Sequence, residues 1–463
     1  MNEKRELFEN VPVPKALWTF AVPTVISQLI NLIYNLADTF YVGRTGDPYM
    51  IASVSLAFTL FVMTVSIANL YGIGGGGLVS RLMGTGNTER AKSVSAFSFY
   101  GALAVSVVYS VIVAVFMTPI LELFGASEYT MEYAKQYTWL VVVFGTVPVV
   151  LSQTMAHFLR NTGYSKQASI GLSGGGVLNM VLDPLLMFVV FPGGMEVFGA
   201  ALATLISNIA SMIYFFIMTR RVAAKTPISI SPKHFARVRP DDRKEVISVG
   251  IPSAILPGLY DLSNIVLNAR MAAHGDMQLA AIGIVLKVER LPNAIGIGIS
   301  QGMLPLVAYN YAAKNKGRMQ NAISYARKSG ILITFFTVLL YELFARQIAG
   351  VFISTTGESS AEVMTVLGFA TMFLRVRSLA SIPMFLNYHT SYCMQAMGDG
   401  VGTLVHSVAR QLVFYIPLMF LFDALFAETG IAWSLLAGEI LGAITALLLL
   451  NRWVKKKFPP GMR

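Results

Sequence analysis

The sequence predicts an all-α integral membrane protein of twelve transmembrane helices, arranged as two pseudo-symmetric six-helix lobes around a central cleft. The prediction rests on composition, on twelve long apolar runs and on the placement of Lys and Arg. Of the 463 residues, 55% are hydrophobic and 13% are charged, whereas a soluble domain carries about 25% charged residues. Mean hydropathy is +0.62. With so few charges, most of the surface must face lipid. The single cysteine excludes an intrachain disulfide and a cysteine-rich zinc site.

A membrane-spanning helix needs about 20 mostly apolar residues. Because the apolar runs are continuous and do not alternate with polar residues, they exclude a β-barrel. The twelve runs are 16–43, 50–78, 94–118, 137–159, 167–191, 198–219, 246–270, 279–308, 329–350, 365–394, 402–422 and 430–451.

The distribution of Lys and Arg supports this count. When the N-terminus is placed in the cytoplasm, 26 of the 35 basic residues fall in inside segments, four fall outside and five lie within spans. Cytoplasmic loops collect Lys and Arg, and one missed helix would invert every later loop. We therefore expect a multi-pass protein of the cytoplasmic membrane with both termini cytoplasmic. The net charge of +11 then reflects membrane topology, and no nucleic acid partner is expected.

The chain divides into two halves that resemble each other. We predict an N-terminal lobe at 1–219, a basic cytoplasmic linker at 220–245 and a C-terminal lobe at 246–463. "GNTER" before the third span corresponds to "KNKGR" before the ninth, and both follow glycine-rich helix ends. Because each half has an even number of helices, the halves would be related by an axis along the membrane normal, with the substrate path between them. Chance similarity between apolar helices is the alternative.

Two carboxylates lie in apolar spans of the first half, where an ionisable side chain is costly and usually functional. Asp38 and Asp183 lie at similar depths in spans one and five. Tyr34 and Asn179 each stand one turn before an acid and share its face. We expect no Lys or Arg within the first six spans, so neither acid has a basic partner there. The two carboxylates suit Na⁺, or they could share a proton; the alternative is that each only fixes helix packing.

The second half differs because acids and bases both occur in its spans. We expect them largely to form internal salt bridges. Asp261 is the exception, since it lies mid-span with Asn264 following on a related face, and a functional and a structural role are equally open for it. The charged residues of these spans are Asp261, Lys287, Glu289, Arg290, Glu342, Arg375, Arg377, Arg410 and Glu439.

Together these features resemble the multidrug and toxic compound extrusion (MATE) family along essentially the whole chain. The resemblance rests on the order and spacing of several motifs, each weak by itself. They are "ADTFYVG" at 37–43, "LVSRLMGTGNTERA" at 78–91, "LRNTG" at 159–163, "NMVLDPLLMF" at 179–188, "GAALAT" at 199–204 and "QGMLPLVAYNYAAKNKGR" at 301–318.

The resemblance implies a Na⁺- or H⁺-driven antiporter that exports amphipathic, mostly cationic drugs and toxic organic compounds by alternating access. It implies a transporter, not an enzyme, with no cofactor beyond the coupling ion. Carried over by residue, the cation site would be Asp38, Asn179, Asp183 and Thr204, with Ala200 lending a carbonyl; the metal would be Na⁺ at the first three. The candidates for the substrate cleft are Gln28, Tyr34, Asn35, Asp261, Asn264, Glu289, Arg290, Arg375 and Arg377.

The chain departs from the family pattern where some members carry an acid in the tenth span. Arg375 and Arg377 stand there, which argues against a second cation site in that lobe and against purely cationic substrates. The arginines also keep one alternative open, a flippase for a lipid-linked precursor from the related exporter superfamily. A channel filter and a nucleotide-binding loop are absent from the sequence. The expected partners are small molecules and the lipid bilayer, and we expect a monomer.

The predicted topology can be tested by labelling single cysteines introduced between residues 225 and 240. An impermeant thiol reagent should leave them unlabelled in intact cells and label them after permeabilisation, because this segment is predicted to face the cytoplasm. A cysteine in the segment at 119–136, predicted to lie outside, is the positive control. Ready labelling of 225–240 in intact cells would contradict the topology.

Overall fold

The computed structural model describes residues 2–191, 193–353 and 360–457, and every regular element within them is a helix. The first part of the chain forms α1 (Asn2–Glu9), α2 (Val13–Gly43), α3 (Pro48–Gly84), α4 (Thr88–Val115), α5 (Met117–Leu123), α6 (Glu128–Thr138), η1 (Trp139–Phe144), α7 (Thr146–Asn161), α8 (Ser165–Leu185), η2 (Leu186–Val190), α9 (Glu196–Val222) and α10 (Pro232–Phe235). The second part forms α11 (Pro240–Ala272), α12 (Asp276–Val288), α13 (Arg290–Ala312), α14 (Lys316–Gly350), α15 (Ser360–Ser378), α16 (Ser381–Ala396), α17 (Gly400–Val408), η3 (Ala409–Tyr415) and α18 (Ile416–Lys457).

Long helices are the expected solution for an apolar chain in lipid, because a helix satisfies its own backbone hydrogen bonds where no water can. Nine helices of the described residues are long and apolar enough to cross a membrane. Two bent pairs, Glu128–Phe144 with Thr146–Asn161 and Ala361–Ser378 with Ser381–Ala396, raise the number to eleven if each pair is one span. The pairs are bent by 43° and 45°.

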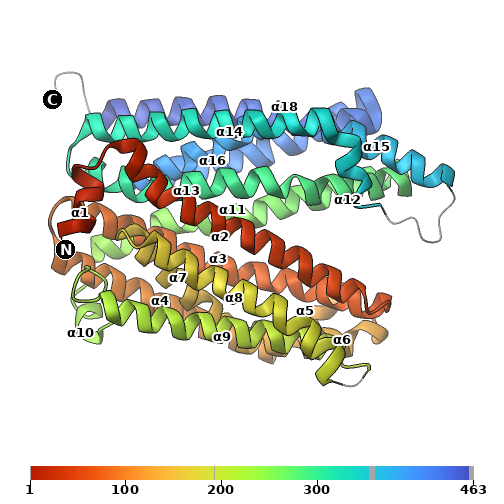
Figure 1. The fold of residues 1–463 in the computed structure, drawn as a ribbon, viewed down its shortest axis with the longest axis horizontal. Helices are drawn as coiled ribbons and strands as arrows, with labels where there is room; N and C mark the ends of the chain where they lie inside the picture. The colour runs from red at the N-terminus through yellow and green to blue at the C-terminus, as the bar shows by residue number, and fades with distance from the viewer. Residues whose placement is uncertain (1, 192, 354–359, 458–463) are drawn as a thin grey trace.

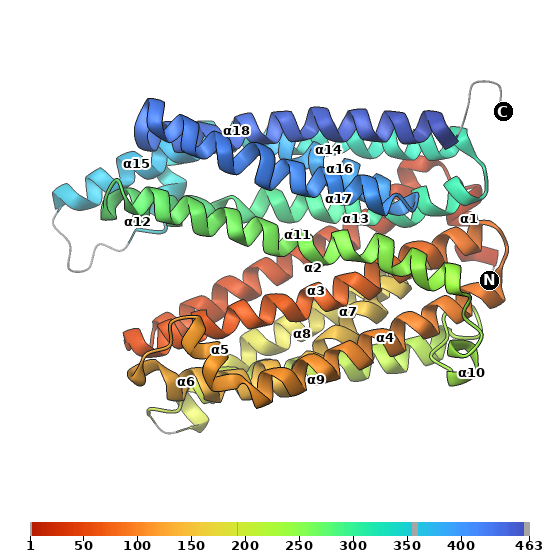
Figure 2. The ribbon, with the colours of Figure 1, turned by 180° about the vertical axis from the view of Figure 1, so that it is seen from behind.

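The last of these nine elements contains two of the predicted runs. Gly400–Lys457 is 58 residues long, which as one straight helix would measure about 87 Å, nearly three times the thickness of a bilayer core. Ala427 breaks it, with φ 52° and ψ −144°. Figure 2 shows the blue ribbon doubling back at the end of the molecule opposite the C-terminus. Each of the twelve predicted apolar runs therefore has a helical counterpart in the described residues.

The long helices lie in two groups, shown in Figures 1 and 2. We name the helices of 13–222 the first group and those of 240–457 the second group. The groups contact each other chiefly through α3 with α11 and α2 with α13. They meet near α1 and the two termini and diverge toward α6 and α12 (Figure 2). The lobe boundaries at 219 and 246 stay predictions.

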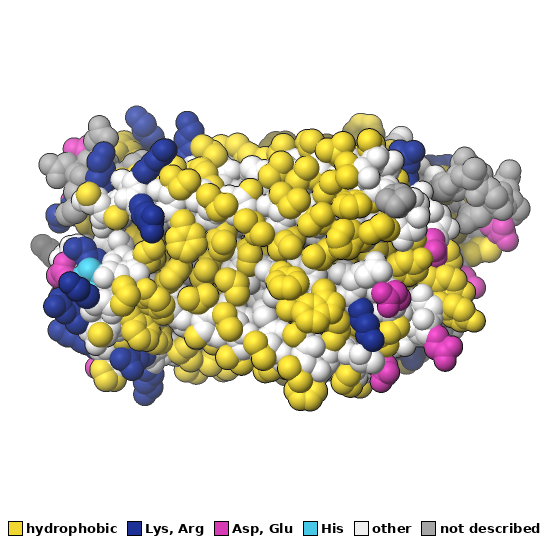
Figure 3. Space-filling model, turned by 90° about the horizontal axis from the view of Figure 1, so that it is seen from below, with side chains coloured by type: hydrophobic (Ala, Val, Ile, Leu, Met, Phe, Trp, Pro, Cys, Tyr) yellow, Lys and Arg dark blue, Asp and Glu magenta, His cyan; other side chains and the backbone are white. Residues whose placement is uncertain are grey.

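The surface matches a membrane protein. Figure 3 shows hydrophobic side chains over the middle of the molecule, with Lys and Arg gathered at the end where Figure 1 shows the termini. Acidic side chains lie mainly toward the other end (Figure 3). An apolar belt between charged ends is the arrangement that a bilayer requires.

The end that carries the termini is closed by helices that nearly touch. A Cβ atom on Gly250 of α11 would lie 2.1 Å from the Leu70 carbonyl oxygen of α3, and one on Gly74 would lie 2.2 Å from the Val246 carbonyl oxygen. Gly302 plays the same part in the α2–α13 contact, where a Cβ would lie 2.5 Å from the Cα of Ala21. Only glycine permits such close backbone approach.

Ion pairs reinforce this closure. Arg81 at the end of α3 donates to the Glu245 carboxylate of α11 at 2.8 Å and to the Gln395 and Ala396 carbonyl oxygens of α16. Arg90 of α4 forms a bidentate pair with the fully buried Asp242. Since each pair joins the first group to the second, we name these four side chains, together with the glycines at 74 and 250, the closed-end clamp.

Replacing Gly250 by alanine should weaken the clamp. The new methyl group would overlap the Leu70 carbonyl, so we expect Gly250→Ala to lower stability by about 1–3 kcal/mol, the usual cost of overpacking. Thermal melting of the purified protein in detergent measures this loss of stability. Gly258→Ala on the same helix is the matched control, because a Cβ there meets nothing within 4 Å. Equal melting of the two variants would contradict the tight α3–α11 contact.

Candidate functional site

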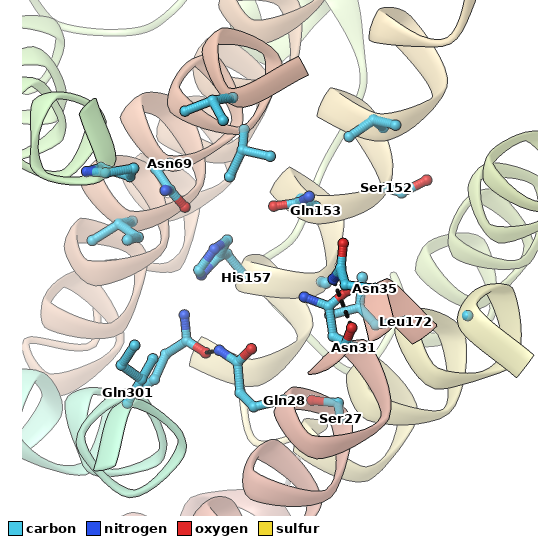
Figure 4. A pocket seen from close by; sticks show the side chains of 18 of the residues that line it. Ser27, Gln28, Asn31, Asn35, Asn69, Ser152, Gln153, His157, Leu172 and Gln301 are labelled. Carbon is cyan, nitrogen blue, oxygen red and sulfur yellow. Dashed lines mark hydrogen bonds between the residues drawn. The ribbon is translucent and has the colours of Figure 1, made fainter. Parts of the chain in front are cut away.

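A cavity of about 550 Å³ lies between the two helix groups. Residues of α2, α3, α7, α8 and α9 line it from the first group, and residues of α11, α13 and α16 line it from the second. Figure 4 shows Gln28 of α2 and Gln301 of α13 pointing toward each other, joined by a hydrogen bond of 3.4 Å. The lining is rich in amide side chains: Gln28, Asn31, Asn35, Asn69, Gln153, Asn179, Asn208, Gln301 and Gln395.

Charged side chains are few in this lining. Among the described residues, the cavity wall carries Asp261 of α11, Arg290 of α13 and Arg160 of α7. Asp261 and Arg290 are close enough for their opposite charges to interact. Arg160 and the neighbouring His157 lie on the other side, in the first group. The cavity wall therefore carries one formal positive charge in excess.

An acidic cluster lies where α2, α8 and α9 pack together. Asn179 lies at the centre of the cluster. Its Nδ2 donates hydrogen bonds to Asp183 Oδ1 at 3.2 Å and to Thr204 Oγ1 at 3.2 Å. Asp183 is fully buried, and the Asp38 carboxylate lies close enough to repel it. Asn179 and Thr204 also line the cavity. The cluster thus stands directly behind the cavity wall.

Three oxygen atoms of the cluster have no hydrogen-bond donor in the described residues: Asp38 Oδ1, Asn179 Oδ1 and Asp183 Oδ2. Burying such acceptors without a partner is costly, and more so when they carry charge. A proton on one carboxylate or a hard cation among the oxygens would remove that cost. The residues present therefore fit a Na⁺ or H⁺ site. The Tyr34 and Tyr137 side chains border the same cluster.

The structure brings most of the predicted first-half residues together. Gln28, Tyr34 and Asn35 line the cavity from α2. Ala200 is buried one turn before Thr204 on α9, behind the acidic cluster. Tyr137 of α6 also borders this region and was not among the predicted site residues.

The predicted cleft residues of the second half do not all lie at the cavity. Asp261 and Arg290 line the cavity, whereas Asn264, Glu289, Arg375 and Arg377 do not. Arg375, predicted as a cleft candidate, is exposed on the outer surface of α15. Two residues along a helix turn the side chain by about 200°, so Arg375 and Arg377 lie on opposite faces.

Arg377 forms part of a buried ionic network. Its Nε and Nη2 donate to the two Glu289 carboxylate oxygens at 2.6 and 2.9 Å, and Nη1 donates to the Tyr415 hydroxyl. A second buried pair, Arg410 with Glu439, lies nearby on η3 and α18. These acids therefore already have cationic partners, unlike the pair in the first group.

The position of Arg160 contradicts the prediction that the first six spans contain no Lys or Arg. The predicted fourth span ends at residue 159, which places Arg160 in the following loop. In the structure, α7 continues to Asn161 and Arg160 is 3% exposed. A helical pattern could have found it: Gln153, His157 and Arg160 recur at spacings of four and three residues, which places them on one face. All three line the cavity.

Comparisons with known proteins agree with this architecture. The family model MatE matches residues 23–185 and 252–421. The chain is 31% identical over 451 residues to "Multidrug export protein MepA" of Staphylococcus saprophyticus, covering 97% of this chain and 96% of that protein. It is 30% identical, with the same coverage, to the protein of that name from Staphylococcus aureus strain MRSA252.

The chain belongs to the MATE family. It is a multi-pass membrane transporter and not an enzyme. Solved structures share the fold. "Outward-facing conformation of a multidrug resistance MATE family transporter of the MOP superfamily" matches with a TM-score of 0.88 at 23% identity, and "Crystal structure of MATE in the straight conformation" with 0.90 at 22%. Each comparison covers 99% of both chains.

The two arginines of α15 provide a prediction with a built-in control. Arg377→Ala should destabilise the transporter by about 3–5 kcal/mol, because it leaves the buried Glu289 carboxylate unpaired. Arg375→Ala should leave stability unchanged, since its side chain is exposed. Thermal melts in detergent compare the variants, and Arg377→Ala combined with Glu289→Gln should recover part of the loss. A stable Arg377→Ala protein would contradict the structural role.

Proposed function

We propose that this MATE transporter exports amphipathic organic compounds, mostly cationic, by alternating access in exchange for Na⁺ or H⁺ bound at Asp38, Asn179, Asp183 and Thr204. Transporters of the family are ion-coupled. The observation that carries the proposal is the acidic cluster, whose three buried oxygens lack donors and lie behind the wall of a central cavity.

The cavity suits chemically varied substrates. Its volume is that of a small-molecule site, which is typically 300–1,000 Å³. Amide side chains can donate or accept hydrogen bonds, and tyrosine rings offer apolar and cation-binding faces. The relatives' name, multidrug export protein, supports drugs as the substrate class and favours export over the flippase alternative.

The cluster is well placed to couple an ion to helix movement. Its side chains come from three helices, and α2 also contacts α13 of the second group. An ion shifts a conformational equilibrium only through its different affinity for the two states. A cation held between α2 and α8 would favour the state in which these helices lie together, and its release would relieve that constraint.

We also infer the orientation in the membrane. Lys and Arg gather at the closed end beside the termini (Figure 3), which supports a cytoplasmic location for both termini. The closed-end clamp would then seal the cytoplasmic side, so that the described state opens outward. The division into lobes at 1–219 and 246–463 and a monomeric state belong to the same proposal.

Removing either acid should uncouple export. We expect Asp38→Asn and Asp183→Asn to express and melt like the unmodified protein but to lose drug resistance and ion-dependent stabilisation, because each deletes the charge while keeping size and hydrogen bonding. Asp261→Asn is the control, since this acid lies apart from the cluster in the second group. The measurements are drug efflux from proteoliposomes under separately imposed Na⁺ and H⁺ gradients, with melting curves in both ions.

The outcomes separate the alternatives. Export driven by only one gradient identifies the coupling ion. Unmodified efflux and ion dependence in both asparagine variants would show that the acids are structural, and a loss in Asp261→Asn alone would move the coupling site to α11.

A further inference from the structure

Four arginines are at least nine-tenths buried in the described residues, and one of them differs from the rest. Three bind a carboxylate of the chain: Arg81 with Glu245, Arg377 with Glu289 and Arg410 with Glu439. The fourth, Arg160, forms no ion pair within the described residues. Its Nε is buried without a hydrogen-bond partner.

A buried guanidinium normally meets an anion or several carbonyl oxygens, because removing its charge from water is costly. Arg81 illustrates the second solution, since it binds two carbonyl oxygens at the end of α16 in addition to Glu245. Arg160 lies in the last turn of α7 and makes no such hydrogen bond in the described residues. Its hydrogen-bonding capacity is therefore free to bind a partner from outside the chain, either water or a ligand.

The side chain of Arg160 borders the cavity, so that partner can reach it. On the α7 face, Gln153 and His157 line the same wall. Across the cavity, α16 of the second group contributes Ser391, Tyr392 and Gln395. A ligand that contacts Arg160 would therefore touch both helix groups.

The acid of the cavity wall does not take this role. Asp261 lies on α11 of the second group, and the cation that it interacts with is Arg290. The acidic cluster lies between α2, α8 and α9, and its Asp183 accepts a hydrogen bond from Asn179. Among the described residues of the cavity wall, no acid therefore pairs with Arg160.

We propose that Arg160 is the residue of this cavity that binds the carboxylate of zwitterionic amphiphiles among the transported compounds. The guanidinium fork matches a carboxylate bidentately. A zwitterion would place its acid group on Arg160, with its cationic ring system against the amides and tyrosines of the cavity. The inference rests on the proposed export function and assigns one residue of the cavity to the acid group of such compounds.

A matched pair of dyes tests this proposal. Rhodamine 110 is a zwitterion with a free carboxylate, and rhodamine 123 is its methyl ester, a cation with nearly the same shape. Binding of each dye to the purified full-length protein is measured by fluorescence anisotropy. We expect Arg160→Gln to weaken rhodamine 110 binding about tenfold or more and to leave rhodamine 123 binding within about twofold, because only the first dye loses a charge-assisted bidentate contact.

Two further variants complete the design. Arg160→Lys keeps the positive charge but loses the planar guanidinium that binds a carboxylate through two N–H groups, so rhodamine 110 binding should fall by less than in Arg160→Gln. If Arg160→Gln proves unstable, Arg160→Lys provides the test of the carboxylate contact. Arg375→Gln removes an exposed arginine outside the cavity and should change neither dye.

The results distinguish the inference from the function on which it rests. Equal loss of both dyes in Arg160→Gln would make Arg160 a structural residue or a site for a small inorganic anion, and unchanged binding of both would remove it from the site. Either result overturns the inference while leaving the export function intact. Failure of the unmodified protein to bind either dye would instead count against the proposed multidrug cavity, and the inference would fail with it.

Discussion

The close approach of α3 to α11 is the contact on which the rest of the structure depends. Gly74 and Gly250 bring two backbones to a distance that no side chain would allow, and Arg81 and Glu245 hold the contact electrostatically. Helices that touch at one end and diverge from there leave space between their other halves. The cavity is thus a consequence of where the small residues lie. In the proposed alternating access, this contact would have to open while the opposite end closes.

Charge is balanced differently in the two helix groups. In the second group, Glu289 and Glu439 are each held by an arginine at hydrogen-bond distance, so a cation gains little by approaching them. Among the described residues of the first group, no Lys or Arg pairs with Asp38 or Asp183, and no acid pairs with Arg160. Buried groups that the chain leaves unpaired are where a low-dielectric interior responds most strongly to an added ion. Under the proposed function, the acidic cluster and Arg160 of the first group would therefore respond most strongly to ions and charged substrates.

The sequence was sufficient for the helices, because helix formation in a membrane depends on local rules. For the acidic cluster, local rules gave only the similar depths of Asp38 and Asp183 and the shared face of Asn179 and Asp183, whereas Thr204 entered through the family resemblance. Apolar runs of membrane length predict helices, and the spacing of Asn179 and Asp183 predicts one helix face. The two predictions that were wrong, for Arg160 and Arg375, depended on where a helix ends and on which face of the helix a residue lies. Arg160 looked like a loop residue because hydropathy falls at the last turn of α7, and Arg375 looked equivalent to Arg377 although they lie on opposite faces of α15.

Asn179 and Thr204 belong both to the acidic cluster and to the cavity wall. Under the proposed function, coupling between ion and substrate would need no long pathway through the protein, because the proposed ion site and the cavity share a wall formed by α8 and α9. A change in the cluster that shifts α8 against α9 changes the cavity lining directly. Reciprocity then follows from thermodynamics, since a substrate that favours one arrangement of this wall must alter the ion affinity by the same factor. A compound bound between Arg160 and α16 would add a second constraint by contacting both helix groups. Ion and substrate would in this way act on the same rigid-body movement from opposite sides of one wall.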